Sequence, residues 1–346
     1  MIDITKTIKK GVEKQEDVSS SVFQGRTSNH KILFALGTDI NFIFYGDNFE
    51  NALNEAVEFI YQTEAKLSVF KPKSEISKLN RFGNYFSIKL SPEVYQLVEK
   101  AVEYSKITDG YFDITVKNLV DYWKNCQNKN QMPSKNQIEE VLFSVGFENI
   151  SFLPNYKIKL KNSAKLDLGA IAKGFVADKI KEIFKKHSIN SAIVDLGGHI
   201  LALGKKEELS WKVGIQHPTK NRGKIVGIIE TFNTSIVTSA SYERYYNIHG
   251  KKLSHIINPK TGYPVEDYIA SVTVIDNNST FADAISTAFY AMGLKKAINF
   301  IQDFKTIDAI VITNSREIYL TPKLKERFTC TDNSYRVISI NEVIIL

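Results

Sequence analysis

The chain has 346 residues but only two cysteines, Cys126 and Cys330, which lie far apart in the sequence. Two thiols exclude a disulfide framework and argue against a cysteine metal site, so we interpret both as ordinary thiols. Runs of 18 apolar residues are also missing, so we expect no transmembrane helix. Residues 1–17 are rich in Lys and Glu, lack an apolar segment and so do not form a signal peptide, and no nearby cysteine could carry a lipid. We therefore expect a cytoplasmic protein, with a membrane-anchored protein outside the cytoplasm as the alternative if a leader has been removed.

A large excess of one charge is absent too. The chain has 45 Lys and Arg against 38 Asp and Glu, a net charge of +7, and its lysines are scattered. No basic block interleaved with aromatic residues occurs, and no zinc-finger spacing, so we expect no nucleic-acid partner. A mildly basic surface is equally suited to attracting an anionic cofactor or an acidic partner.

What the chain does contain is enough apolar sequence for a sizeable core: 43% of its residues are hydrophobic and 24% are charged. Only about the first 25 residues have a composition typical of disorder. The length fits one large unit or two intimately packed lobes. Strand and helix patterns alternate without a strict βαβ rhythm, so we predict an α+β (mixed α/β) architecture and not a doubly wound sheet.

Several elements follow from local pattern. Residues 32–45 are β-branched and apolar around Gly37-Thr38, which predicts two strands joined by a kink. Ser91-Pro92 predicts the start of a helix with Ser91 as its N-cap. The remaining predictions are helices over 51–67, 91–107 and 137–145, a hairpin over 150–160 and a polar loop over 125–135.

Residues 165–180 suggest a phosphate site. We expect a strand that ends at Gly169 and a helix that starts at once, with Gly169 and Gly174 keeping side chains away from the helix N-terminus. Free backbone N–H groups there suit an anion, and Lys173 adds a positive charge. A plain strand-to-helix turn explains the pattern equally well, and neither a P-loop nor a GxGxxG fingerprint is present.

Residues 193–200 and 237–264 come next. Residues 193–200 contain an apolar stretch followed by Gly197-Gly198, which predicts a tight turn and allows the backbone to pass close to a ligand. The second stretch combines small hydroxyl residues with His255, which directly precedes a strong turn signal at 258–262. A lone histidine is more often an ordinary structural residue, but His255 is also a candidate proton acceptor.

Residues 278–289 suggest a metal site. Asp283 and Thr287 are four residues apart and so share one face of a helix. A carboxylate and a hydroxyl suit a hard ion such as Mg²⁺, which keeps several waters and also binds phosphate oxygens. The alternative is a capping box, with Thr280 as the N-cap and Asp283 at position N3.

Together these segments resemble the ApbE family, the FAD:protein FMN transferases, from about Ile32 to about Tyr319. Eight segments match in the family's order: Leu36–Thr38, Leu67–Phe70 with Ser74–Asn80, Thr108–Thr115, Asp167–Gly174, Asp195–Gly198, Thr238–Tyr245, His255–Pro264 and Ala282–Ala288. The resemblance implies two packed α/β lobes with the FAD site at their junction. It also implies an N-terminal extension over 1–28, a transferase domain over 29–330 and a tail over 331–346.

The resemblance further implies an activity: Mg²⁺-dependent transfer of FMN from FAD to a Ser or Thr hydroxyl of an acceptor flavoprotein, with release of AMP. Mn²⁺ is an alternative metal. It implies a metal site made of Asp283, Thr287 and the carbonyls of Ala170 and Ser286, with His255 as general base. The implied FAD contacts are Leu36, Phe70, Tyr111, Phe112, Asp113, Asp167, Lys173 and Ile256.

Two residues depart from the family pattern: Ala240 where Gly is common and Asn258 where Asp is commoner. Two other functions stay open. An FAD pyrophosphatase would use the same metal and phosphate site to release FMN and AMP to water, and a flavin-binding protein would not turn over. The combination of Asp283, Thr287 and His255 argues against the second.

Overall fold

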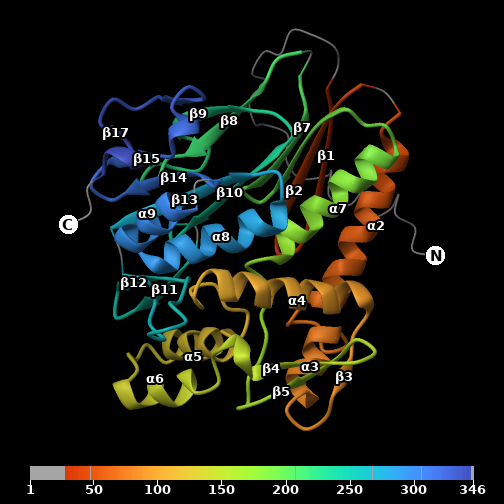
Figure 1. Cartoon of the computed structure of the whole chain (residues 1–346), viewed down its shortest axis with the longest axis vertical. Coiled ribbons are helices and arrows are strands. Elements are labelled where there is room, and N and C mark those ends of the chain that lie inside the picture. Colours follow the sequence, from red (N-terminus) through yellow and green to blue (C-terminus); the bar gives the residue numbers. More distant parts are fainter. Residues whose placement is uncertain are drawn as a thin grey trace.

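The computed structural model describes residues 28–46, 48–206, 208–242, 244–266, 268–304 and 306–343 (Figure 1). The extension predicted for residues 1–28 therefore lies outside the described residues, apart from Ser28. No helix in this described part combines the length and apolarity needed to cross a membrane. The mixed α/β class predicted from the sequence is confirmed.

A nine-stranded sheet forms the centre of the molecule (Figure 1). Neighbouring strands are antiparallel, except that β15 and β17 are parallel. In sheet order the strands are β1 (Ser28–Ala35), β2 (Thr38–Tyr45), β6 (Ser191–Leu196), β7 (His199–Gly204), β10 (Thr234–Ala240), β13 (Ile269–Asp276), β14 (Asp308–Thr313), β15 (Glu317–Leu320) and β17 (Arg336–Ser339). The division of the chain at residue 330 stays a prediction, although β17 of the predicted tail belongs to this sheet.

Both faces of the sheet are covered, which explains why its central strands are so apolar. Helices α2 (Glu50–Leu67), α7 (Ala172–Lys186), α8 (Ser279–Met292) and α9 (Leu294–Asp303) pack on one face (Figure 1). A three-stranded sheet packs on the other, and consists of β8 (Trp211–Gln216), β9 (Ile225–Thr231) and β16 (Phe328–Cys330). Strand β13 is consequently buried at seven consecutive residues, and side chains from both of its faces enter apolar clusters.

A second, smaller part of the molecule lies beside the helical layer. It contains α3 (Glu75–Phe82), α4 (Pro92–Ile107), α5 (Lys117–Asn128), α6 (Lys135–Leu142) and a sheet of β3 (Ile88–Lys89), β4 (Ile150–Leu153) and β5 (Lys157–Leu160). The hairpin β11 (Tyr245–Ile248) and β12 (Lys251–Ser254) packs on α5 and α6 around Trp123. The 3₁₀ turns are η1 (Phe147–Asn149), η2 (Pro322–Leu324) and η3 (Ile340–Glu342).

Most of the predicted elements are present. The structure has the two strands around Gly37, the helices at 51–67 and 91–107, and the hairpin at 150–160. The loop predicted over 125–135 is wrong at its start, because α5 continues to Asn128 and buries Cys126. The predicted helix at 137–145 begins earlier, at Lys135, and ends at Leu142. Ser91 is the N-cap residue of α4, but its side chain makes no capping hydrogen bond.

Helices α7 and α8 meet at Gly174. A Cβ atom at this position would lie 2.4 Å from the Ser279 carbonyl oxygen, so no side chain fits between the helices. Nearby, the Asp178 carboxylate accepts the backbone N–H groups of Ser279 and Thr280, both at 2.9 Å. A side chain of α7 therefore satisfies two of the N–H groups that the first turn of α8 leaves unpaired. This contact fixes where α8 begins relative to α7.

We predict that Gly174→Ala destabilises the protein by about 1–3 kcal/mol, because the added methyl group forces two packed backbones apart. In an uncrowded helix the same substitution would stabilise the protein by up to about 1 kcal/mol, so the sign of the stability change distinguishes the two situations. Chemical denaturation measures the difference. Gly169→Ala is the control, since its Cβ would meet only the Asp167 carboxylate, at 3.1 Å. Equal or greater stability of Gly174→Ala would contradict the crowded crossing.

Candidate active site

A cavity of about 1320 Å³ opens between the large sheet and the smaller part of the molecule. Of the thirteen site residues predicted from the sequence, it is lined by twelve. They are Leu36, Phe70, Tyr111, Phe112, Asp113, Asp167, Ala170, Lys173, His255, Ile256, Asp283 and Thr287. Ser286 does not line the cavity, because its side chain is buried against Ser239 and the Asp283 carbonyl. The folded chain thus brings together residues that are up to 251 positions apart.

Asp283 and Thr287 lie one turn apart on α8 and both face the cavity. One oxygen of the Asp283 carboxylate, Oδ2, accepts the backbone N–H of Gly174 at 2.9 Å. The Thr287 hydroxyl lies 3.3 Å from the Ser239 hydroxyl on β10. With the carbonyls of Ala170 and Ser286, the candidate donors are all oxygen atoms, which is the ligand type that Mg²⁺ and Mn²⁺ prefer.

The capping-box interpretation of this segment is wrong. The N-cap of α8 is Asn278, whose side chain accepts the N–H of Phe281 at 2.9 Å. Thr280 is instead the second residue of the helix, and its hydroxyl donates to Asp178 at 2.6 Å. Because Asn278 and Asp178 cap the helix, the Asp283 carboxylate is not needed for capping and is available to a ligand.

The imidazole of His199 lies behind Asp283 and is completely buried. Its Nδ1 is 3.9 Å from Asp283 Oδ2, and neither ring nitrogen has a hydrogen-bond partner among the described residues. Burial by itself raises the pKa of the Asp283 carboxyl, but His199, Lys173 and the Gly174 amide outweigh it and lower the pKa. Asp283 is therefore a carboxylate at neutral pH, as a metal ligand must be.

The segment before α7 differs from its prediction. No strand ends at Gly169: Lys165 makes an isolated bridge with Val116, and α7 begins at Ala172. A side chain takes the place of a partner strand here. Asn80 Oδ1 accepts the backbone N–H of Leu166 at 2.6 Å, and Asn80 Nδ2 donates to the Leu166 carbonyl at 2.8 Å. Lys173 lines the cavity and has no ion pair within the part of the chain that the structure describes.

Two acidic residues of the cavity hold its loops. Asp113 Oδ1 accepts the N–H and the hydroxyl of Thr115, at 2.7 and 2.6 Å. Burial raises the pKa of the Asp113 carboxyl to about 6, although these hydrogen bonds partly offset the effect. Asp167 Oδ1 accepts the N–H of Gly169 at 2.9 Å. Both carboxylates thus shape the walls that a ligand would meet.

Aromatic side chains form another part of the cavity lining. Phe70 has 82% of its surface exposed, which offers a ring face to a flat ligand. Tyr111 is buried beneath two lysines: Lys296 donates to its hydroxyl at 2.5 Å, and the Lys260 ammonium lies 4.8 Å from its ring centroid. These contacts fix the ring of Tyr111 in one orientation.

His255 directly follows β12 and lines the cavity. Its Nδ1 lies 2.9 Å from the carbonyl oxygen of Arg244. A carbonyl only accepts, so Nδ1 carries the proton and Nε2 keeps a lone pair. Burial lowers the pKa of His255 to about 4, despite the hydrogen bond to Arg244. The ring is thus neutral at pH 7, with one nitrogen able to accept a proton.

The two departures from the family pattern have different surroundings. Asn258 Oδ1 accepts the N–H of Lys260 at 2.9 Å, and its Nδ2 donates to the Ala291 carbonyl of α8 at 3.2 Å. A carboxylate could not make the second bond, so Asn258 ties the turn to α8 in a way that Asp could not. Ala240 is the last residue of β10, and nothing in the structure explains its difference from Gly.

Sequence reasoning missed several residues of the cavity. Ser239 and Arg244 belong to a stretch that it singled out, but neither was chosen, and Glu243 of that stretch lies outside the described residues. His199, which does not line the cavity but lies buried behind Asp283, follows the Gly197-Gly198 turn and carried no signal of its own. The loop between β8 and β9 was missed completely, because its polar residues look like any surface turn.

We predict that His255 stays neutral until the pH falls to about 4. Burial disfavours the charged ring, so protonation requires a more acidic solution than for an exposed histidine. NMR titration of the imidazole resonances, assigned with His255→Gln, measures the pKa. A midpoint near 6.5 would mean that the ring is not desolvated and would contradict the geometry described here.

Comparison with known proteins identifies the family of the chain. The model of the ApbE family matches residues 36–311. The FAD:protein FMN transferase of Treponema pallidum (strain Nichols) is 30% identical over 297 residues, which are 81% of this chain and 82% of the relative. The FAD:protein FMN transferase of Klebsiella pneumoniae (strain 342) is 29% identical over 291 residues, 84% and 90% of the two chains.

Solved structures share the fold. The ApbE protein from Thermotoga maritima superposes with a TM-score of 0.81 at 29% identity, over 87% of this chain and 99% of that one. The flavin transferase ApbE from Vibrio cholerae gives a TM-score of 0.76 at 22% identity, over 88% and 100%, which supports the fold alone. With a family model that matches most of the sequence, the chain belongs to the ApbE family.

Proposed function

We propose that this protein transfers FMN from FAD to a Ser or Thr hydroxyl of an acceptor protein and releases AMP. The observation that carries the proposal is the pairing of Asp283 and Thr287 with the neutral His255 in one large cavity. The relatives described above are named FAD:protein FMN transferase, which supports the same reaction. FAD and a protein acceptor are therefore the two substrates.

In the proposed reaction, the acceptor oxygen attacks the FMN-side phosphorus of FAD. The bond between that phosphorus and the bridging oxygen breaks, and AMP leaves with the bridging oxygen. The proton of the acceptor hydroxyl passes to Nε2 of His255. FMN remains joined to the acceptor by a phosphoester bond, so atoms and charge balance without an oxidant or reductant.

We assign FAD contacts to the residues already predicted. Lys173, with no carboxylate partner among the described residues, suits the pyrophosphate, and the exposed ring of Phe70 suits the flavin. The remaining proposed contacts are Leu36, Tyr111, Phe112, Asp113, Asp167 and Ile256.

The metal ligands are proposed to be Asp283, Thr287 and the carbonyls of Ala170 and Ser286. One carboxylate is a small charge for a divalent ion, and among the described residues no group of three His, Cys, Asp or Glu could hold a metal. This suits Mg²⁺ or Mn²⁺, which commonly bind through one or two carboxylates together with substrate phosphates. When bound, the ion neutralises charge that develops on the phosphate oxygens.

We predict that a candidate acceptor gains the mass of one FMN when it is incubated with this protein, FAD and Mg²⁺. EDTA and Asp283→Asn should each abolish the gain, because the substitution keeps the size of the side chain but removes its charge. Intact-protein mass spectrometry measures the product, and Asp303→Asn, on the exposed end of α9, is the control. Release of FMN and AMP without an adduct would identify a pyrophosphatase instead.

We predict that His255→Ala slows transfer by about 10²–10⁴-fold, the contribution typical of a general base. FAD affinity, measured by flavin fluorescence, should be retained. The activity of the wild-type protein should fall only as the pH approaches about 4, where the imidazole becomes protonated and loses its lone pair. His249→Ala, at an exposed turn between β11 and β12, is the control. Full transfer activity of His255→Ala would rule out the base assignment.

A further inference from the structure

One wall of the cavity has no role in the proposed FAD or metal site. The loop between β8 and β9, residues 217–224, lines the cavity with Pro218, Thr219, Lys220, Asn221 and Arg222. None of the thirteen predicted site residues comes from β8, β9 or this loop. The loop residues 219–224 are exposed, so a macromolecule can reach them. This wall is therefore available to a second substrate.

The size of the cavity also supports a place for a second substrate beside FAD. Pockets for a single small ligand usually measure about 300–1000 Å³, whereas this cavity measures about 1320 Å³. FMN transfer requires FAD and a segment of the acceptor protein in the same cavity. Since the predicted FAD contacts lie on other elements, the acceptor segment is the substrate that remains for the β8–β9 loop.

Three cationic residues lie in the loop, and the two that line the cavity, Lys220 and Arg222, have different surroundings. The Lys220 ammonium lies 2.7 Å from the Asp332 carboxylate, so its charge is already paired. Arg222 is exposed, and within the described ranges it has no acidic partner within 4.0 Å. The guanidinium of Arg222 is thus free to take a carboxylate, for which its fork of N–H donors is well suited.

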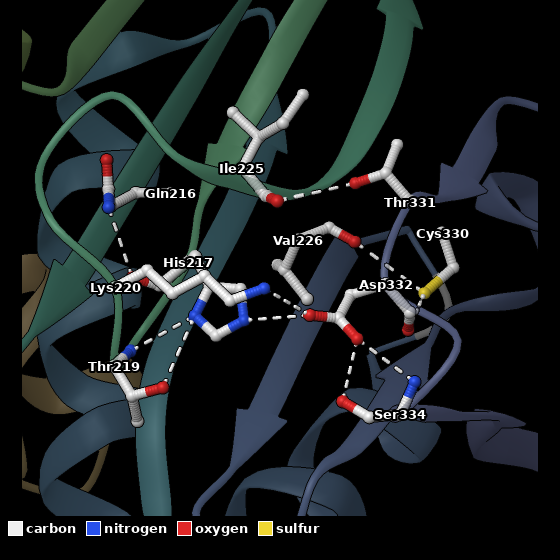
Figure 2. A network of polar contacts seen from close by, with 10 residues as sticks. All are labelled: Gln216, His217, Thr219, Lys220, Ile225, Val226, Cys330, Thr331, Asp332 and Ser334. Atoms are coloured by element: carbon white, nitrogen blue, oxygen red, sulfur yellow. Dashed lines mark hydrogen bonds and ion pairs between the residues drawn. The ribbon is translucent and has the colours of Figure 1, made fainter.

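Asp332, which follows β16, connects the loop to the C-terminal part of the chain (Figure 2). Its Oδ2 accepts from Lys220 at 2.7 Å and lies 3.2 Å from His217 Nε2. Its Oδ1 accepts the N–H and the hydroxyl of Ser334, at 3.0 and 2.7 Å. A carboxylate has about four acceptor positions, and all four are used here. Hydrogen bonds from Lys220 and Ser334 accordingly lower the pKa of Asp332.

His217 connects this carboxylate to the backbone of the loop. Its Nδ1 accepts the N–H of Thr219 at 3.2 Å, so the proton of a neutral ring is on Nε2 and points at Asp332. The imidazole of His217 is buried, and the ring of Tyr335 packs edge-on against it with 5.5 Å between the ring centroids. The loop is therefore fixed by a segment that lies beyond residue 311, where the family match ends.

We propose that the β8–β9 loop is a docking wall for the acceptor protein, with Arg222 binding an Asp or Glu side chain close to the accepting Ser or Thr. Asp332 is a positioning residue that holds this wall in place. The inference rests on the proposed transferase activity. The occupant is an extended acidic segment of the acceptor, because the free charge of the wall is positive and a carboxylate is its complement.

The experiment needs no known acceptor. A library of 12-residue synthetic peptides with a central Thr and random flanks is incubated with the protein, FAD and Mg²⁺. Peptides that gain FMN are identified by mass spectrometry. With the wild-type protein, Asp and Glu should be enriched about threefold to fivefold at one or more flanking positions, the effect that one exposed ion pair supports. The enrichment should shrink at 1 M salt.

Arg222→Glu should replace this preference with one for Lys and Arg, without a change in FAD affinity. Because the Arg222 side chain contacts no other described residue through a hydrogen bond or ion pair, the variant should fold normally. Lys212→Glu is the matched control: it reverses an exposed charge on β8, in the same hairpin, but does not line the cavity.

Asp332→Asn gives a second, independent test, because a net-charge effect and a positioning effect would change the selection of acidic peptides in opposite directions. Removal of a negative charge beside the cavity would strengthen acidic selection if only net charge mattered. Loss of the hold on the loop should weaken it instead, again with FAD affinity retained. Stronger acidic selection in Asp332→Asn would overturn the positioning role.

The outcomes separate this inference from the proposed function. Adducts without acidic enrichment, or with the same enrichment in Arg222→Glu, would overturn the docking wall and leave the transferase intact. No adducts but accumulation of AMP would overturn both, since a pyrophosphatase needs no acceptor. No adducts and unchanged FAD would overturn the proposed function itself.

Discussion

The close contact of α7 and α8 at Gly174 is the constraint on which the candidate site depends. Because Gly174 has no side chain, its backbone N–H comes within 2.9 Å of the Asp283 carboxylate. The Asp178 carboxylate, one turn further along α7, binds the first N–H groups of α8. One helix therefore sets the start of the other and the orientation of its acidic side chain. The proposed metal ligands Asp283 and Thr287 of α8 therefore line the same cavity as Lys173 of α7.

The sequence predicted the fold class and most elements because their patterns are local. Strands β1 and β2 come from one largely apolar stretch interrupted by a glycine, and α2 has a clear apolar face. The errors occur where tertiary contacts override local pattern. The segment before α7 has the pattern of a strand, but the backbone N–H and carbonyl of Leu166 bond to the side chain of Asn80, 86 residues away, and not to a neighbouring strand. The Thr280–Asp283 capping box is wrong because Asn278 is the N-cap of α8, and because the Thr280 hydroxyl donates to Asp178 of another helix.

The candidate site was predictable to the extent that its residues occur in recognisable segments. Asp283, Thr287 and His255 could be proposed from spacing and neighbours alone. His199 and Asp332 could not, because burial and partners from distant segments give them their character. The charge of Arg222 is likewise ordinary in sequence. It becomes notable only because its neighbour Lys220 is paired with Asp332 and Arg222 is not.

The most direct test of the central claim is anomalous diffraction from crystals of the protein grown with FAD and Mn²⁺. The account predicts one manganese peak in the cavity, bound by oxygen atoms of Asp283 and Thr287 and by the pyrophosphate of FAD. A peak elsewhere in the cavity, or FAD bound with no manganese beside α8, would contradict it. In that case the contact of α7 with α8 would stabilise the fold without building the site.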